Sequence, residues 1–166
     1  LMREEILLRL MADQDWAEVA KIYQEGIDSG LATFEKSVPS WDAWNANHIP
    51  TCRLVAETNH EIVGWAALSA VSSRCVYGGV AEVSVYVAKK ARGQKIGEML
   101  LQKLILESEQ NGYWSLQSGI FPENEASIRL HKKTGFRQIG YKERIGALDG
   151  VWKDNILMEK RSQTVG

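Results

Sequence analysis

The sequence predicts a mixed α/β domain in which about seven strands form one mostly antiparallel sheet flanked by about four helices. The 166 residues are enough for one hydrophobic core but few for two. Strand-like and helix-like stretches follow one another along the whole chain, with no internal repeat and no Pro/Gly/Ser-rich linker. The sequence therefore favours a single domain covering residues 1–166.

The N-terminal part of the chain predicts one strand and then two helices. The apolar segment ILLRL at 6–10 predicts the strand. Asp13 is expected to cap a helix that ends near Gly30, because apolar residues recur there with a 3.6-residue period. After a loop, Ser40 is expected to cap a second, short helix at 41–49. The periodic apolar residues of the first helix are Trp16, Val19, Ala20, Tyr23 and Ile27.

The rest of the chain alternates strands with two further helices. Apolar, β-branched stretches separated by Asn- and Gly-containing turns indicate a hairpin around Thr58, Asn59 and His60, followed by a strand after Gly78 and Gly79. The expected strands are 52–57, 61–71, 80–88, 113–121, 136–145 and 151–160, and the expected helices are a long one ending at Asn111–Gly112 and one at 123–135 ended by Gly135.

Charge and cysteine content exclude several classes of function. A net charge of −1 argues against a general nucleic-acid or membrane-surface binder. Cys52 and Cys75 have no second thiol or histidine at ligand spacing, so neither a zinc cluster nor a disulfide scaffold is expected, and no metal is predicted. Two unpaired thiols, no apolar run of membrane-spanning length, and a signal-peptide pattern interrupted by Glu4 and Glu5 lead us to expect a cytoplasmic protein.

The segment ARGQKIGEMLLQKLI at 91–105 is the strongest candidate for a phosphate site. Its apolar residues lie on one helical face, so the helix should pack on the sheet with the N–H groups of its first turn unpaired. Those donors and the helix dipole favour a phosphate, and Gly93 and Gly97 would allow a close approach. The spacing fits equally well a glycine-bearing loop with solvated Arg92 and Lys95. It fits neither a P-loop nor a Rossmann turn.

The strand VAEVSVYVA followed by KKARGQKIGEMLL resembles the acyl-CoA-binding motif of the GNAT superfamily of N-acetyltransferases. The family turn Q/R-x-x-G-x-G/A is matched except that Lys95 replaces a glycine, which requires a backbone conformation that a Cβ tolerates. The segments TFEKSVPSWDAW, SRCVYGGVAEVSVYV, PENEASIRLHKKTGF and DGVWKD are similar to the phosphinothricin and methionine sulfoximine acetyltransferase branch. The resemblance implies a GNAT fold and acetyl-CoA as acetyl donor, with the cofactor's pyrophosphate on Arg92, Gly93, Gln94, Lys95, Ile96, Gly97 and Glu98.

Acetyl transfer to an amine requires a base, because α-amino groups, with a pKa of about 8 or higher, are mostly cationic at neutral pH. Glu82 matches the glutamate that this branch uses, and a partly dry cleft would raise its pKa. Without the resemblance, Glu82 would be interpreted as a surface residue of a strand. His131 stands where many family members carry a tyrosine that protonates the leaving thiolate. The resemblance makes it a candidate general acid, although a lone helical histidine is more often structural or solvated.

The resemblance also implies residues that hold the two substrates. Val85, Tyr86 and Val87 would bind the cofactor, with backbone groups of the two valines acting like an added strand and a backbone N–H stabilising the oxyanion. Asn124, the expected N-cap of a helix, would bind the pantetheine arm, with Ser127 one turn further on. The residues implied for the acceptor are Phe34, Glu35, Arg74, Tyr77 and Trp152.

The function expected from these features is acetyl transfer to the amine of a small amino-acid-like acceptor such as phosphinothricin, methionine sulfoximine or methionine sulfone. Direct transfer is favoured over an acetyl-cysteine route because neither cysteine has a neighbouring histidine. The resemblance further implies a homodimer whose pocket borrows residues from both subunits. Alternatives are an acetyltransferase for a protein N-terminus or an aminoglycoside, and a non-catalytic acyl-CoA sensor.

Overall fold

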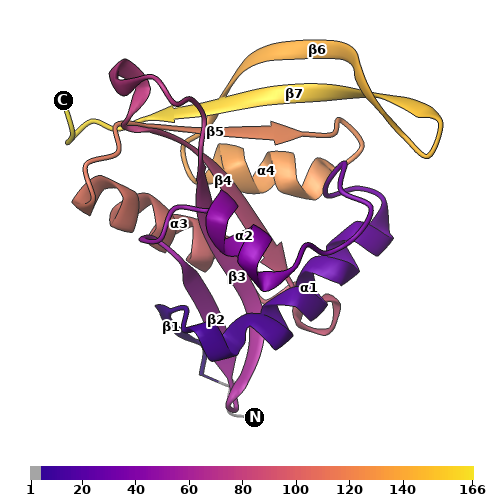
Figure 1. Cartoon of the computed structure of the whole chain (residues 1–166), viewed down its shortest axis with the longest axis vertical. Helices are drawn as coiled ribbons and strands as arrows, with labels where there is room; N and C mark the ends of the chain where they lie inside the picture. Colours follow the sequence, from indigo (N-terminus) through magenta and orange to yellow (C-terminus); the bar gives the residue numbers. More distant parts are fainter. Residues whose placement is uncertain (1–4) are drawn as a thin grey trace.

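One seven-stranded sheet organises residues 5–166, the part of the chain that this computed structural model describes (Figure 1). The strand order is β1-β2-β3-β4-β5-β7-β6, and only β4 and β5 pair in parallel. With four α-helices around this sheet, the predicted fold class is confirmed. Residues 1–4, and with them Glu4, lie outside the described residues. The strands are β1 (Leu7–Leu10), β2 (Leu54–Thr58), β3 (Glu61–Ala70), β4 (Val80–Val87), β5 (Ser115–Ile120), β6 (Arg137–Leu148) and β7 (Val151–Arg161), and the helices are α1 (Trp16–Ser29), α2 (Trp41–Asn47), α3 (Ile96–Gln110) and α4 (Glu125–Lys133).

The start of α1 differs from the prediction. Asp13 does not cap the α-helix but begins a single 3-10 turn, Asp13–Asp15, which precedes it. The carboxylate of Asp15 is buried and accepts hydrogen bonds from the backbone N–H of Ala12 and from the guanidinium of Arg9, 2.7 Å away in each case. Asp15 therefore holds the start of the helix in place, the role that the sequence spacing predicted for Asp13. The other caps follow the prediction, since Ser40 accepts from Ala43 N at α2 and Gly30 ends α1 at φ +69°.

The turns explain where the strands end. Asn59 and His60 both have positive φ, as a two-residue type I′ hairpin requires, and this turn joins β2 to β3 as predicted. At the C-terminus, β6 extends to Leu148, and a turn at Asp149–Gly150 joins it to β7, which begins at Val151. The final hairpin is therefore longer than predicted. Figure 1 shows this hairpin extending beyond the helices.

The helices cover both faces of the sheet. Trp65 of β3 and Tyr86 of β4 stack with ring centroids 4.8 Å apart and pack against α1 and α2, through Tyr23 and Trp44. Gly64, the strand neighbour of Trp65, faces Leu100 and Ile96 of α3 on the opposite side. Because side chains alternate along a strand, Glu82 and Ser84 share the α1 and α2 face with Tyr86.

Strands β4 and β5 diverge, and this divergence positions the site. They are paired only from Val80↔Ser115 to Glu82↔Gln117, although β4 continues to Val87 and β5 to Ile120. Figure 1 shows the two strands separating from this short parallel stretch. Beyond Glu82, β4 therefore has a partner strand on its β3 side only. Among the described residues, no helix is long and apolar enough to span a membrane.

Candidate active site

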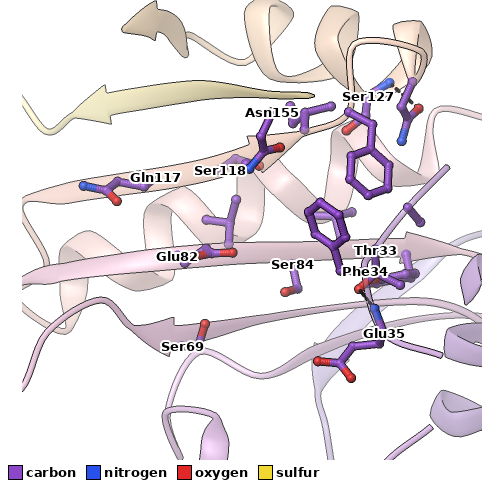
Figure 2. Close-up of a pocket in the computed structure, with 18 of the residues that line it drawn as sticks. Thr33, Phe34, Glu35, Ser69, Glu82, Ser84, Gln117, Ser118, Ser127 and Asn155 are labelled. Carbon is purple, nitrogen blue, oxygen red and sulfur yellow. Dashed lines mark hydrogen bonds between the residues drawn. The ribbon is translucent and has the colours of Figure 1, made fainter. Parts of the chain in front are cut away.

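A pocket of about 650 Å³ lies where β4 and β5 separate. Its walls come from α1 and the loop after it, the end of α2, strands β3, β4 and β5, helix α4, and the β6–β7 hairpin. Figure 2 shows side chains of these regions, among them Glu82, Gln117 and Ser127, gathered around one space. Segments that are far apart in sequence therefore meet at the divergence.

Glu82 lies at the last position of β4 that is paired with β5, and it faces this pocket. Water reaches its carboxylate through the open pocket, but the surrounding walls remove part of its hydration, and this desolvation raises the pKa of Glu82 above the ordinary carboxylate range. Its carboxylate makes no salt bridge with another described residue. A carboxylate in this environment holds a proton more readily than a fully hydrated one, as suits a general base.

The backbone of β4 beyond Glu82 forms one side of the opening. Val85 and Tyr86 line the pocket. Val87 follows them in the part of β4 that has no β5 partner. The Tyr86 ring is fixed between Tyr23 and Trp65, and burial raises the pKa of its hydroxyl. Tyr86 is therefore held as a neutral packing residue, while the strand edge beside it is free to hydrogen-bond an extended ligand.

The start of α3 offers the anion site that the sequence predicts. Helical hydrogen bonding begins with Met99 N donating to Lys95 O, and none of the backbone N–H groups of residues 93–98 donates to another described residue. They surround the positive end of a 15-residue helix. A second depression, of about 580 Å³, lies over this turn and is lined by Gly93, Gln94, Lys95 and Glu98 together with Met99, Gln102 and Ile6. These donors fit a diphosphate.

Lys95 adopts the conformation that glycine favours. Its φ of +62° and ψ of +22° lie in the left-handed region, which a residue with a Cβ adopts less readily than glycine. The turn keeps the geometry of a glycine although the residue is a lysine. A left-handed conformation costs a non-glycine residue about 1–2 kcal/mol, and strain of this kind occurs often at functional sites.

We expect Lys95→Gly to be more stable than Lys95→Ala by about 1 kcal/mol in free energy of unfolding, because only glycine relieves the positive φ. The two variants lose the same side-chain charge, so the comparison isolates the backbone. Urea denaturation of both variants measures the difference. Equal stabilities would show that the turn relaxes and stores no strain at Lys95.

The two glycines of the turn have different environments. Gly93 has a φ of +82°, and a Cβ there would meet nothing within 4 Å, so this glycine is needed for backbone conformation. A Cβ at Gly97 would lie 3.3 Å from Leu130 Cδ2 and 3.6 Å from Val87 Cγ2. Gly97 therefore allows α3 to approach α4 and β4 closely.

Asn124 is the N-cap of α4, as expected, and its amide also holds the loop after α1. Its Oδ1 accepts from Ser127 N at 3.3 Å, and its Nδ2 donates to Leu31 O at 3.2 Å. Both Asn124 and Ser127 line the pocket. The loop that carries Phe34 and Glu35 is thus tied to the helix expected to contact the pantetheine arm.

His131 lies on α4 and also lines the pocket, with only 4% of its surface exposed. Its Nδ1 is 2.7 Å from Ser127 O, and since a carbonyl can only accept, Nδ1 carries the proton. Burial lowers the pKa of His131, so the ring is neutral and Nε2 is a buried lone pair without a partner among the described residues. In this state His131 is an acceptor at Nε2, whereas a general acid needs a proton there.

Of the residues implied for the acceptor, Phe34 and Glu35 line the pocket and three others do not. Arg74 and Tyr77 lie on the outer surface before β4, where the guanidinium is 5.6 Å from the tyrosine ring centroid. Trp152 is 57% exposed on the β6–β7 hairpin and has Arg144 over its ring. Each of these side chains belongs to a cation–π pair on the surface, and none of them lines the pocket of the single chain.

Several pocket residues were not identified from the sequence. They are polar side chains on strands and loops that carry no motif: Thr33, His48, Ser69, Ser84, Gln117, Ser118, Lys142 and Asn155. Alternation along β4 and β5 could have placed Ser84 and Gln117 on exposed faces, but not around a common space. Only the divergence of two strands brings them together.

A sheet that opens at a partly desolvated carboxylate, beside a helix start with unpaired N–H donors, is the architecture of an acyl-CoA-dependent N-acyltransferase. The model of the Acetyltransferase (GNAT) family matches residues 16–136, and the chain belongs to this family. It is an N-acetyltransferase that uses acetyl-CoA.

Curated relatives and solved structures agree with this assignment. The chain is 31% identical over 159 residues to phosphinothricin N-acetyltransferase of Alcaligenes faecalis, covering 92% of this chain and 81% of the relative. It is 34% identical over 106 residues to L-methionine sulfoximine/L-methionine sulfone acetyltransferase of Salmonella typhimurium, covering 64% of this chain and 62% of the relative. The crystal structure of a GNAT superfamily phosphinothricin acetyltransferase from Sinorhizobium meliloti in complex with acetyl-CoA superimposes with a TM-score of 0.81 at 27% identity, covering 96% of this chain and 95% of that one.

Proposed function

We propose that this enzyme transfers the acetyl group of acetyl-CoA directly to the α-amine of a small amino-acid-like acceptor, with Glu82 as general base. Phosphinothricin, methionine sulfoximine and methionine sulfone are the expected acceptors, in line with the names of its relatives. The observation that carries the proposal is the position of Glu82, a desolvated carboxylate in the pocket at the point where β4 loses its β5 partner. We place this chemistry in a single acetyltransferase domain.

In this proposal the turn at 92–98 binds the pyrophosphate of the cofactor, and the free edge of β4 at 85–87 binds its pantetheine arm. The cofactor supplies an activated thioester carbonyl. A backbone N–H on the free edge of β4 stabilises the negative charge that develops on that carbonyl oxygen. Asn124 and Ser127 line the same pocket as β4, where they would limit how far the arm can shift.

Glu82 removes one proton from the ammonium form of the acceptor, leaving a neutral amine that can attack the thioester carbon. The new C–N bond forms as the C–S bond breaks, and the nitrogen must lose a second proton while the thiolate gains one. His131 can serve both needs, because its Nε2 lone pair accepts the proton from nitrogen and then returns it to sulfur. This shuttle lets a neutral histidine act where a permanently protonated acid is disfavoured by burial.

We also propose a homodimer, in which a second subunit would contribute side chains that one chain leaves outside the pocket. Tyr77, Val76 and Trp152 are large apolar residues exposed on the surface of the single chain. Light scattering after gel filtration is expected to give twice the mass of one chain, and a monomer at working concentration would contradict the dimer. The free thiols of Cys52 and Cys75 support a reducing, cytoplasmic location, which fractionation of the producing cells would test.

A panel of amines assayed with acetyl-CoA for thiol release tests the proposed acceptor class. We expect kcat/KM to be highest for methionine sulfone, methionine sulfoximine or phosphinothricin, and at least tenfold lower for a peptide with a free N-terminus and for an aminoglycoside. Preference for either of the last two would replace the proposed acceptor class. Tight acetyl-CoA binding without acetyl transfer to any amine would favour a non-catalytic sensor instead.

A further inference from the structure

The β6–β7 hairpin carries an irregularity beside the pocket. Lys142 of β6 pairs with Asn155 of β7, but the next pair is Gly146 with Lys153, so residues 143–145 lie opposite Asp154 alone. Within this bulge Arg144 has a φ of +48°, a strained value for a non-glycine residue. Bulges of this kind redirect neighbouring side chains and are frequent next to active sites.

Asp154 holds the bulge in place. Its Oδ1 accepts a hydrogen bond from Arg144 N at 2.7 Å, and its Oδ2 accepts one from the Tyr141 hydroxyl. One carboxylate therefore ties together the residue that precedes Lys142 and the strained residue at the centre of the bulge. The bonds fix the strand register at Lys142.

The pair next to the bulge faces the pocket. Lys142 and Asn155 stand opposite each other in the ladder, so their side chains share one face of the sheet, and both line the pocket. The amide of Asn155 lies over Gly119 of β5, where a Cβ would be only 2.6 Å from Asn155 Nδ2. Figure 2 shows Asn155 beside Ser118 at the wall of the pocket.

The charges of the pocket give this pair a function. Among the described residues that line it, Lys142 is the only lysine or arginine, and Glu35 and Glu82 are the carboxylates. The side chain of Lys142 makes no salt bridge with another described residue, whereas Arg74 lies outside the pocket. A free cation at one wall and a proton-accepting carboxylate at another match a zwitterion whose amine and anionic group lie at opposite ends.

We propose that Lys142, beside Asn155, binds the carboxylate of the acceptor, and that Asp154 is the positioning residue that keeps Lys142 in the pocket wall. The inference rests on the proposed amino-acid acceptor and names the residue of this chain that makes the enzyme prefer an amino acid over a simple amine. A carboxylate gains most from a cation that is not already paired.

The test compares methionine sulfone with 3-(methylsulfonyl)propylamine, which is the same molecule without the carboxylate. Lys142→Met is expected to raise KM for methionine sulfone about tenfold, with little change in kcat, in KM for acetyl-CoA or in kcat/KM for the amine. Each acceptor is compared with itself in the unsubstituted enzyme, so the different pKa values of the two amines cancel. Lys132→Met, which removes an exposed lysine of α4 outside the pocket, is the matched control.

The outcomes separate the two proposals. Equal kinetics of Lys142→Met and Lys132→Met on methionine sulfone would overturn the role of Lys142 and leave amino-acid acetylation intact. Failure of the unsubstituted enzyme to acetylate any amino acid, with activity on the simple amine, would overturn both.

Asp154 needs its own readout, because a bulge can also serve stability alone. Asp154→Ala is expected to weaken the preference for methionine sulfone over the simple amine, as Lys142→Met does. Asp154→Asn keeps an acceptor for Arg144 N and is expected to restore the preference. If Asp154→Ala keeps the full preference, Asp154 does not position Lys142.

Discussion

Glu82→Gln is expected to lower kcat by about 10²–10⁴ at neutral pH while the affinity for acetyl-CoA stays unchanged. Glutamine has nearly the same shape as glutamate and cannot take a proton from an ammonium group. Stopped-time or continuous measurement of thiol release gives kcat, and calorimetry gives the affinity for acetyl-CoA. The matched control, Glu123→Gln, removes an exposed carboxylate outside the pocket and should retain full activity.

The pH dependence distinguishes a base from a residue that only binds substrate. Burial raises the pKa of Glu82, so the acid limb of the kcat profile should lie above the ordinary carboxylate range. In Glu82→Gln that limb should disappear, and the rate should rise with pH as the acceptor amine deprotonates by itself. The deficit of the variant should therefore shrink toward high pH. A deficit that is constant at all pH values would remove Glu82 as the base.

Glu82→Gln, which is expected to lower kcat, should not lower the free energy of unfolding. Because the pKa of Glu82 is raised in the folded protein, the folded state binds this proton more tightly than the unfolded chain does. Ionising Glu82 then lowers the free energy of unfolding as the pH rises through the interval between the unfolded and folded pKa values. Glutamine carries no charge, so above that interval Glu82→Gln should be at least as stable as the parent. A large loss of stability would indicate that Glu82 has a structural role.

Local signals in the sequence were sufficient for most of the helices, strands and turns. The period of α1, the caps at Ser40 and Asn124, and the Asn59–His60 hairpin each depend on neighbouring residues, and all are confirmed. The helix entry at Asp15 was missed because its partner Arg9 lies on β1, and spacing within the helix contains no trace of that contact.

The pocket could be predicted only in part, because it is made by tertiary structure. Glu82 and Asn124 were found through the family resemblance, and both line the pocket. Lys142 and Asn155 were missed, since they reach the pocket through a bulge whose register is set by Asp154. Arg74 and Trp152, which the resemblance implies for the acceptor, lie on the outer surface of the single chain, and their role stays a prediction.

The short pairing between β4 and β5 is the feature on which the whole site depends, and Gly79 makes it possible. Gly79 is buried directly before β4, and its carbonyl accepts hydrogen bonds from Trp114 N at 2.8 Å and Ser115 N at 3.2 Å. The Trp114 ring covers the Cα of Gly79, so a Cβ would lie 2.0 Å from Trp114 Cε3. The backbone of Trp114 is held in place as well, because Ser162 N and Arg161 Nη1 both donate to Trp114 O.

Gly79→Ala is therefore expected to lower the free energy of unfolding by about 1–3 kcal/mol, as overpacking of a buried site does, which corresponds to about 2–4 °C in Tm for each kcal/mol. Affinity for acetyl-CoA should fall with it, since the pairing that sets the opening of the sheet begins at the next residue, Val80. The matched control is Gly78→Ala, because Gly78 has an ordinary φ of −60° and a Cβ there would only approach Cys75 O at 3.2 Å. Thermal unfolding and calorimetry of both variants measure the two effects. If Gly79→Ala is as stable as Gly78→Ala and binds acetyl-CoA normally, the Trp114 contact does not hold the two strands together, and the divergence must be set by the strands beyond Glu82.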